Sequence, residues 1–194
     1  MTVLRIHPGY AVLMAVAVVT AIALAGLNGP PLPLSGTTSA PESRTDAVPP
    51  SHSGLSGVAR VIDGDTIDIQ GVRIRLNGID APETKQHCVA NDSSNYRCGL
   101  QATEALISLI GSNVVRCDQT GTDRNGRVIG RCAIGSLDIG GWMVEHGWAV
   151  AYRRFSLAYV DQENRARALK SGIWAGSFTS PEDWRRQKRE GVSQ

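Results

Sequence analysis

Three short segments of the chain, at 58–62, 66–69 and 72–79, alternate between apolar and polar residues. Such alternation is typical of β-strands with one buried face, and the Gln-Gly pair between the last two segments is a turn signal. In segment 72–79 the apolar residues are expected to face the core, so Arg75 should point away from it. The pattern therefore predicts a hairpin that carries an arginine on its outer face.

A helix is predicted at 100–110, because apolar residues recur there at helical spacing and a glycine follows. Segments 114–118 and 128–134 are typical of two further strands, joined by a polar loop with an Asn-Gly turn signal. Five strands and one helix indicate an α+β domain that is mainly β. We expect a small five-stranded Greek-key barrel, plugged by the helix and with further helices packed on it.

Three more helices are predicted after the barrel. Asp138 can cap a helix at 139–146, and Ser156 can cap one at 157–171. The last helix begins at Ser180, which is followed by a proline and two acidic residues. We interpret its basic run as a solvated face, with contact to nucleic acid or anionic lipid as the alternative. The run consists of Arg185, Arg186, Lys188 and Arg189.

The first part of the chain carries targeting and linker signals. Residues 1–27 combine an early basic residue with a long apolar run, which predicts either a signal peptide or an uncleaved membrane anchor through residues 10–27. Segment 28–56 is rich in Pro, Ser, Thr and Gly and is predicted to be a disordered linker. We therefore expect an exported protein, periplasmic or secreted, with a folded domain at 57–175 and a helical extension at 176–194.

Composition leaves the partner open. The 194 residues suit one domain with appendages, and a net charge of +2 is too small to indicate a nucleic-acid partner. The basic residues are 17 arginines and three lysines. Arginine binds phosphate through two parallel N–H donors, which would suit a nucleic-acid partner. A GC-rich genome would produce the same excess of arginine over lysine, so this excess does not identify the partner.

The four cysteines all follow the linker, and thiols of exported proteins tend to be oxidised. Cys117 and Cys132 lie on consecutive predicted strands, whereas Cys88 and Cys98 bracket one loop. Of the three possible connectivities we therefore predict Cys88 with Cys98 and Cys117 with Cys132. A zinc site that includes His87 is the competing interpretation, but the chain has no C-x-x-C pair.

Four carboxylates lie at the ends of the predicted hairpin. Asp63 and Asp65 flank a glycine, and Asp80 and Glu83 flank an Ala-Pro pair that ends the strand. A set of ligands made only of oxygen atoms suits a hard cation. Calcium fits best, with magnesium or manganese next.

Three motifs occur in a fixed order along the chain. They are D-G-D-T at 63–66, R-L-N-G-I-D-A-P-E-T at 75–84 and D-R-N-G-R at 123–127. Together they resemble the staphylococcal nuclease (thermonuclease) family over roughly residues 57–174. The resemblance implies an OB-fold barrel and a calcium-dependent endonuclease that cleaves both DNA and RNA and leaves the phosphate on the 3′ oxygen.

The resemblance also implies a role for each matching residue. Asp65 and Asp80 correspond to calcium ligands, joined by the backbone carbonyl of Ala81, and Asp63 is expected to lie farther from the ion. Glu83 corresponds to the general base that orients or deprotonates the attacking water. The two arginines that would stabilise the charged transition state are Arg75 and Arg127.

Departures from the family pattern concern the nucleotide. A family lysine-tyrosine pair in the loop is replaced by Arg124 and Asn125, and the second of two family tyrosines is missing, which leaves Tyr152 with Arg154 nearby. Arg124 and Tyr152 are therefore the candidate substrate-binding residues. Ala81 replaces a threonine, which should not matter because its carbonyl is the ligand.

The main alternative from another class is a binding module. OB-folds also hold oligonucleotides or oligosaccharides without any chemistry, and such a module could serve in the cell envelope. A purely structural role is a third interpretation. All three candidate catalytic residues are present, which favours an enzyme that acts on nucleic acid. We expect a monomer, and the sequence implies no protein partner.

Overall fold

The computed structural model describes residues 54–191. The predicted signal or anchor segment and most of the predicted linker lie outside these residues. Within them, no helix is long and apolar enough to cross a membrane. The larger strands are β1 (Leu55–Asp63), β2 (Thr66–Ile69), β3 (Val72–Leu76), β7 (Val114–Thr122) and β8 (Val128–Ile134). The helices are α1 (Cys98–Ile110), α2 (Ile139–Glu145), α3 (Val160–Leu169) and α4 (Pro181–Arg189), with a 3-10 turn, η1, at Gly172–Ala175.

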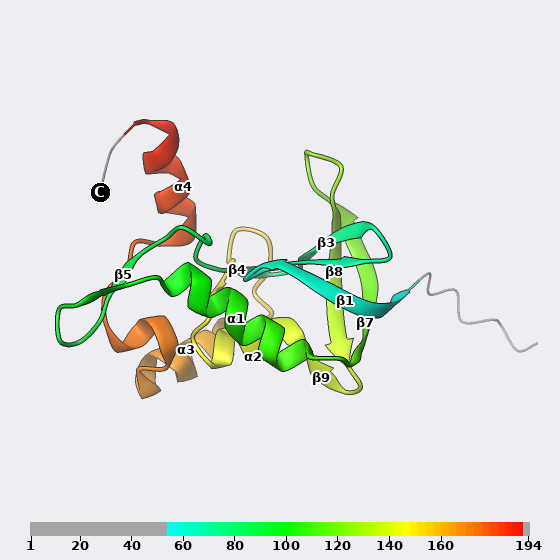
Figure 1. Cartoon of the computed structure of the whole chain (residues 1–194), viewed down its shortest axis with the longest axis horizontal. Helices are drawn as coiled ribbons and strands as arrows, with labels where there is room; N and C mark the ends of the chain where they lie inside the picture. The colour runs from blue at the N-terminus through cyan, green and yellow to red at the C-terminus, as the bar shows by residue number, and fades with distance from the viewer. Residues whose placement is uncertain (1–53, 192–194) are drawn as a thin grey trace, which may run out of the picture. The chain divides into compact units, whose positions relative to one another are not determined.

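The five larger strands form a closed barrel. Neighbouring strands follow the order β3-β2-β1-β7-β8, and β3 closes the ring by pairing in parallel with β8. A short strand, β9 (Leu137–Asp138), pairs antiparallel with the end of β8. The predicted mainly β architecture with a five-stranded OB-fold barrel is confirmed (Figure 1).

The barrel core is filled from α1 as well as from the strands. Leu106 and Ile110 of α1 are buried in one apolar cluster with Ile67 and Ile74, whose Cα atoms are partners between β2 and β3. Burying an aliphatic side chain of this size contributes about 1.5–3 kcal/mol. Helix α1 begins at Cys98, two residues before the predicted start, and ends as predicted at Ile110. This packing fixes α1 against the hairpin that carries the acidic residues.

The strand predicted at 72–79 is interrupted. Strand β3 ends at Leu76, and Gly78 has a φ of +78°, a backbone conformation that ends an extended strand. The chain resumes as β4 (Ile79–Asp80), which pairs with β10 (Val150–Ala151). Asp80 is therefore held beside the segment that follows α2.

Two strands begin or end outside their predicted limits. The sheet begins at Leu55, where this residue pairs with Cys117. The last two residues of the predicted linker, 55 and 56, therefore belong to the barrel. Strand β7 continues to Thr122 beyond the predicted end at Asp118, since its ladder with β8 resumes after an irregularity between Gln119 and Gly121.

Both predicted disulfides are present. Cys117 and Cys132 are register partners on β7 and β8, and Cys88 is joined to Cys98 at the start of α1. The loop that the first bridge closes contains a hairpin of β5 (Cys88–Val89) and β6 (Asn95–Tyr96), which the sequence did not predict. Two-residue strands contain too few positions to show an alternation.

The helices after the barrel differ in how well they were predicted. Asp138 accepts a hydrogen bond from the Gly141 N–H and caps α2, as predicted. Helix α3 begins three residues later than predicted, because the Ser156 hydroxyl closes a local turn by accepting from the Ala158 N–H. It ends at Leu169, two residues before the predicted end, and Lys170 caps it in the left-handed region.

Helix α4 begins as its sequence predicts. The Ser180 hydroxyl accepts from the Asp183 N–H at 3.2 Å, and Pro181 occupies the first turn. In Figure 1 the barrel strands gather at the right, α1 crosses the centre and α4 stands at the upper left. Helix α4 therefore lies apart from the barrel core.

Candidate active site

The predicted acidic cluster is assembled by close packing around Gly64. A Cβ at Gly64 would lie 2.7 Å from the Cβ of Ala81 and 3.1 Å from that of Ala102 in α1, so only glycine allows this approach. The neighbouring carboxylate of Asp65 accepts hydrogen bonds from the Thr66 hydroxyl and from the Ala81 N–H, both at 3.1 Å. Segments 63–66 and 79–81 are thereby tied together.

Arg75 bridges the two buried aspartates. Its Nη1 donates to Asp65 Oδ1 at 3.0 Å and its Nη2 donates to Asp80 Oδ1 at 2.8 Å. The register explains this contact, since Thr66 and Arg75 are Cα partners across β2 and β3. The side chain of Arg75 is 18% exposed, against 6% for Asp65 and 1% for Asp80. The arginine and the two acids are thus brought together on the outer side of the hairpin.

The cluster carries more negative charge than Arg75 alone compensates. Burial is the main cause that raises the pKa of Asp65 to about 7. Arg75 and the Ala81 N–H act in the opposite direction, while the carboxylates of Asp63 and Asp80 add to the rise. Additional positive charge at this position would stabilise the ionised carboxylate.

The ligand chemistry of this cluster fits a hard cation. Asp65 and Asp80 supply buried carboxylate oxygens, and the backbone of Ala81 adjoins both. Among residues 54–191, however, no three His, Cys, Asp or Glu side chains converge to form a cage made of protein ligands alone. The residues present therefore fit an open site, at which water and a substrate oxygen complete the coordination of the ion.

Glu83 lies on a turn that a buried glutamine supports. Gln86 is fully buried, and its side-chain oxygen accepts from the Glu83 N–H at 3.2 Å, while its own N–H donates to the Glu83 carbonyl at 2.7 Å. Its side-chain nitrogen donates to the carbonyl of Thr179, just before α4, at 2.7 Å. The sequence gave no signal for this role, because a single Gln in a polar loop has no diagnostic spacing.

Arg185 of α4 also enters the cluster. Its Nη1 lies 2.9 Å from both Asp80 Oδ1 and Glu83 Oε1, and its Nη2 lies 2.9 Å from Asp80 Oδ2. Burial alone would lower the pKa of Arg185, but the hydrogen bonds to Asp80 and Glu83 outweigh burial and raise it. The prediction that the basic run is a solvated face is therefore wrong for Arg185. Its side chain is 25% exposed.

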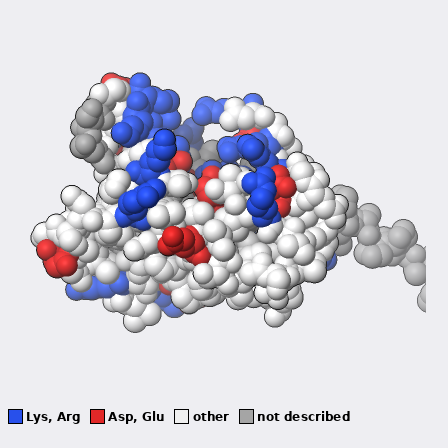
Figure 2. All heavy atoms as spheres, viewed as in Figure 1, with Lys and Arg blue, Asp and Glu red and all other residues white. Residues whose placement is uncertain are grey.

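The other predicted arginines lie on the β7–β8 hairpin. Arg127 directly precedes Val128, the Cα partner of Ile74 on β3, so the base of the hairpin adjoins the strand of Arg75. The guanidinium of Arg127 is bound to Asp123 at 2.7 Å and not to the acidic cluster. Arg124 is exposed at the tip. Figure 2 shows Lys and Arg side chains gathered over this hairpin and over α4, with acidic atoms between them.

Tyr152 lies near Asp80, close enough to be influenced by its charge. Its N–H donates to the carbonyl of Gly78 at 2.9 Å, directly after the pairing of β10 with β4. Burial raises the pKa of Tyr152, and the negative charges of Asp80 and Glu182 contribute to the rise. Tyr152 and Asp80 also line one open pocket of about 550 Å³, together with Arg154. A ligand in this pocket would contact both the acidic cluster and the tyrosine.

Comparison with known proteins finds a matching family and several relatives. Residues 73–176, more than half of the chain, match the family described as staphylococcal nuclease homologue. The chain is 39% identical over 123 residues to the succinoglycan biosynthesis protein ExoI of Rhizobium meliloti. These aligned residues cover 62% of this chain and 64% of that protein. It is 34% identical over 139 residues to an uncharacterized endonuclease of Escherichia coli, covering 68% and 84%.

A third relative is the micrococcal nuclease of Shigella flexneri. The two proteins are 30% identical over 154 residues, which cover 70% of this chain and 83% of the relative. The match to the family begins at Arg73, just before Arg75, and includes Asp80, Glu83 and Arg127. The closed barrel and these matches together establish that the chain belongs to the family of staphylococcal nuclease homologues.

Proposed function

We propose that this protein is an exported, calcium-dependent nuclease that hydrolyses phosphodiester bonds of DNA and RNA. Membership of the family and the relatives named as nucleases support a nuclease function, and the family is generally metal-dependent. The observation that carries the proposal is the bridge of Arg75 between two buried aspartates, because it concentrates opposite charges at one point. A phosphodiester anion needs both a cation and hydrogen-bond donors at such a point.

Asp65, Asp80 and the carbonyl of Ala81 would hold the calcium ion in this proposal. A bound calcium ion supplies positive charge that polarises the phosphate and favours a nearby water as a nucleophile. The burial of both aspartates supports the assignment, since a desolvated carboxylate interacts more strongly with a cation than an exposed one. Magnesium or manganese are the next candidates.

Glu83 would act as the general base. Its carboxylate is 34% exposed, so water can reach it, while Gln86 fixes the turn that carries it. A general base must lie within hydrogen-bond reach of the proton that it removes, and a rigid turn maintains that distance. Glu83 would take a proton from the attacking water as the water oxygen bonds to phosphorus, while the bond from phosphorus to the 5′ oxygen breaks and that oxygen takes a proton from solvent.

Arg75 and Arg127 would stabilise the phosphate as it gains charge. Each guanidinium offers parallel N–H donors that match two phosphate oxygens. In the structure these donors bind Asp65, Asp80 and Asp123, so substrate would have to replace carboxylate oxygens with phosphate oxygens. Such an exchange is favoured as the phosphate becomes more negative in the transition state.

Arg124 and Tyr152 would contact the rest of the nucleic acid. Arg124 is exposed at the hairpin tip, where a backbone phosphate can approach it. Tyr152 lines the pocket beside Asp80 and offers a ring on which a base can stack. A lysine-tyrosine pair is absent from this loop, so the preference between DNA and RNA is expected to differ from that of the family prototype.

Export is part of the proposal and rests on two observations. The first 27 residues have the composition of a signal peptide or anchor, and the folded domain contains two disulfides. Disulfides persist in oxidising compartments outside the cytoplasm. Fusion of residues 1–56 to a reporter enzyme that is active only after export would test this, and a reporter retained inside the cell would contradict it.

A single assay separates a nuclease from a binding module. Full-length protein is incubated with end-labelled single-stranded DNA and, separately, RNA, first with calcium and then with an excess of chelator. We expect cleavage with calcium, a product whose phosphate remains on the 3′ oxygen, and no cleavage with chelator. Retention of intact nucleic acid on a filter under both conditions would instead indicate a non-catalytic OB-fold module.

A further inference from the structure

Helix α4 supplies a residue to the site although it lies outside the segment that matches the family. The match ends at residue 176, and α4 spans Pro181–Arg189. Arg185 is nevertheless as close to Asp80 as Arg75 is, with contacts of 2.9 and 2.8 Å. The acidic cluster is therefore neutralised from two sides, by the barrel and by the C-terminal helix.

Arg185 uses the oxygens that a cation would need. Its two terminal nitrogens bind the two carboxylate oxygens of Asp80 separately, and one of them also binds Glu83. Asp80 is 1% exposed and already accepts a bond from Arg75. Arg75 and Arg185 already place two positive groups on this buried carboxylate, and Arg185 engages both of its oxygens, so a cation would have to compete for the same oxygens as a third positive group at short range. A cation on Asp80 and the guanidinium of Arg185 in its present position are therefore mutually exclusive.

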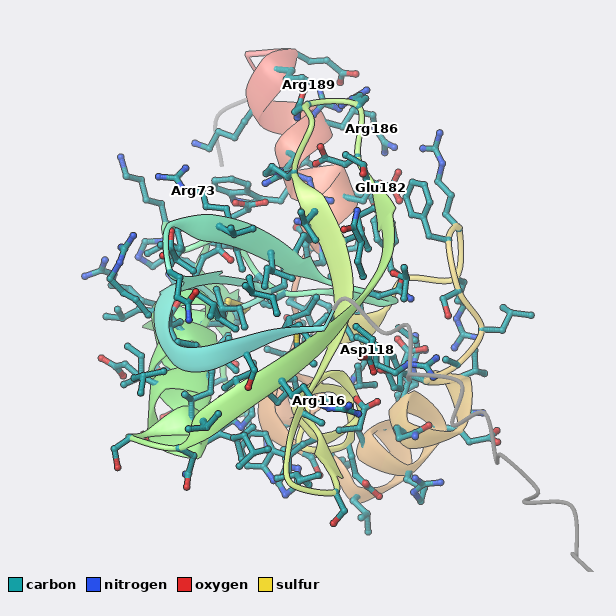
Figure 3. The ribbon with its side chains drawn as sticks, turned by 90° about the vertical axis from the view of Figure 1, so that its right-hand side faces the viewer. Arg73, Arg116, Asp118, Glu182, Arg186 and Arg189 are labelled. Atoms are coloured by element: carbon teal, nitrogen blue, oxygen red, sulfur yellow. A yellow bond between two sulfur atoms is a disulfide. The ribbon has the colours of Figure 1, made fainter. Side chains whose placement is uncertain are left out.

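The attachment of α4 is polar and shallow, which makes its release inexpensive in free energy. Pro181 is the one buried residue of this helix. Apart from Arg185, its described links include the exposed ion pair of Arg154 with Glu182 at 3.2 Å and the bond from Gln86 to the preceding Thr179. Figure 3 shows Arg186 and Arg189 projecting from the helix, and both are exposed. Elements with few buried apolar contacts open locally at low cost.

We propose that Arg185 is an internal counter-ion of the metal site, and that a divalent cation binds by displacing it and loosening α4. Without a cation, the guanidinium neutralises Asp80 and binds one carboxylate oxygen of Glu83, so that this oxygen cannot accept a proton from the attacking water. With a cation, Asp80 exchanges one positive partner for another and Glu83 is freed. This inference rests on the metal-dependent part of the proposed function.

Calcium binding to the full-length chain, measured by titration calorimetry without nucleic acid, tests the proposal. If Arg185 occupies the site in about nine-tenths of molecules, Arg185→Gln should tighten calcium binding roughly tenfold, because the competent fraction rises toward one. Arg185→Lys keeps the charge but cannot bind two Asp80 oxygens and Glu83 together, so it should tighten binding as well. Arg186→Gln removes the same charge from an exposed position of α4 and should leave the affinity unchanged.

Proteolysis supplies an independent measurement of α4. Lys188 is one of only three lysines in the chain and lies in the last turn of α4, so a lysine-specific protease reports on this helix. Calcium should accelerate cleavage after Lys188 in the wild-type protein. In Arg185→Gln the cleavage should already be fast with chelator present.

The outcomes that would overturn the proposal can be told apart. If both Arg185 variants bind calcium as the wild type does, the guanidinium does not compete with calcium for Asp80. The same conclusion follows if Arg185→Gln binds calcium more tightly but Arg185→Lys does not. Calcium binding without faster cleavage after Lys188 would show that α4 stays in place. If no variant binds calcium, the calcium-dependent function is refuted as well. If the protein cleaves nucleic acid but the Arg185 variants have unchanged calcium affinity, only the role of Arg185 is refuted and the proposed function stands.

Discussion

Gly99, the second residue of α1, lies directly against the backbone of Glu83. A Cβ at Gly99 would overlap the carbonyl oxygen and carbon of Glu83. The turn that carries the candidate general base is thus pressed onto the start of the helix that fills the barrel. The Cys88–Cys98 disulfide is attached to the neighbouring residue of the same helix.

This contact predicts that Gly99→Ala impairs catalysis as well as stability. The new methyl group must push the Glu83 turn outward, because backbone atoms cannot rotate away from it. A misplacement of about 1 Å at a catalytic group can cost roughly 100-fold in rate. We expect kcat to fall roughly 10- to 100-fold, with a stability loss of about 1–3 kcal/mol in urea unfolding.

Gly121→Ala is the matched control for Gly99→Ala. A Cβ at Gly121 would meet nothing within 4 Å, and this position lies on β7 away from Glu83. Its turnover should equal that of the wild type. An unchanged kcat in Gly99→Ala, with the expected loss of stability, would show that the position of the Glu83 turn does not limit the reaction.

Loss of either central aspartate should abolish activity. Asp65→Ala or Asp80→Ala removes a buried oxygen ligand and frees Arg75 from one of its two partners. We expect no measurable cleavage and no calcium binding by calorimetry, while the circular dichroism spectrum of the barrel persists. Asp92→Ala, in the exposed loop between β5 and β6, should retain full activity. Full activity of either central variant at limiting calcium would refute the ligand assignment.

The sequence predicted what depends on local patterns and motifs. The barrel strands, the burial of α1, the disulfide pairs and the placing of Asp65 and Arg75 on one hairpin all follow from alternation, helical spacing or short motifs. The strand at 72–79 was predicted too long, because a single Gly78 with positive φ interrupts an otherwise regular alternation. The start of α3 was wrong because a serine hydroxyl can close a turn as readily as it caps a helix.

The role of Arg185 could not be predicted from these patterns. It lies 105 residues after Asp80. Its helix carries three further basic residues, and the sequence does not distinguish which of the four contacts the acidic cluster. Only the docking of α4, through Gln86 and Thr179, decides which of them turns inward. Contacts of this kind depend on tertiary packing and leave no periodic signal.

The two disulfides should differ in their effect on activity. Each bridge closes a loop of similar size, with sequence separations of 10 and 15, so each should stabilise the fold by about 2–4 kcal/mol. Replacing Cys88 and Cys98 by serine should also lower kcat, because that bridge fixes the start of α1 beside Glu83. Replacing Cys117 and Cys132 should lower only the free energy of unfolding. Equal kcat values in the two double variants would contradict this difference.

Tyr159 should make the fold sensitive to alkaline pH. Its hydroxyl donates to Asp138, at 2.9 and 3.1 Å from the two carboxylate oxygens, and burial followed by this charge raises its pKa. A pKa raised in the folded state means that the folded protein holds the proton more tightly than the unfolded chain. The resulting stability is present below pH 10, the usual tyrosine value, and is lost as the pH rises above it.

Urea unfolding of Tyr159→Phe at two pH values measures this contribution. At pH 8 the variant should be less stable than the wild type by about 0.5–1.5 kcal/mol, the net value of one hydrogen bond. Above pH 10 the two proteins should converge, since the wild type then loses the same term. Parallel pH profiles would show that Tyr159 titrates alike in the folded and unfolded chains.

Arg75 and Arg127 should act on the transition state more than on the bound substrate. Arg75 binds two different aspartates through two different nitrogens, and Arg127 binds Asp123 through its Nε. Lysine keeps the charge but offers a single ammonium group, so Arg75→Lys and Arg127→Lys lose the forked geometry. If these hydrogen bonds strengthen as the phosphate oxygens gain charge, losing one raises the barrier by roughly 3–4 kcal/mol. Turnover should then fall about 100- to 1000-fold, with a much smaller change in KM.

Steady-state kinetics beside filter binding decides whether these arginines belong to an enzyme or to a binding module. Arg73→Lys is the matched control, because Arg73 lies on the same strand, two residues from Arg75, and is exposed (Figure 3). Its kinetics should equal those of the wild type. A binding module would show the reverse pattern, in which affinity for nucleic acid falls and there is no turnover to lose. Turnover within about threefold of the wild type in both Arg75→Lys and Arg127→Lys would contradict their role, because charge without the guanidinium fork would then suffice.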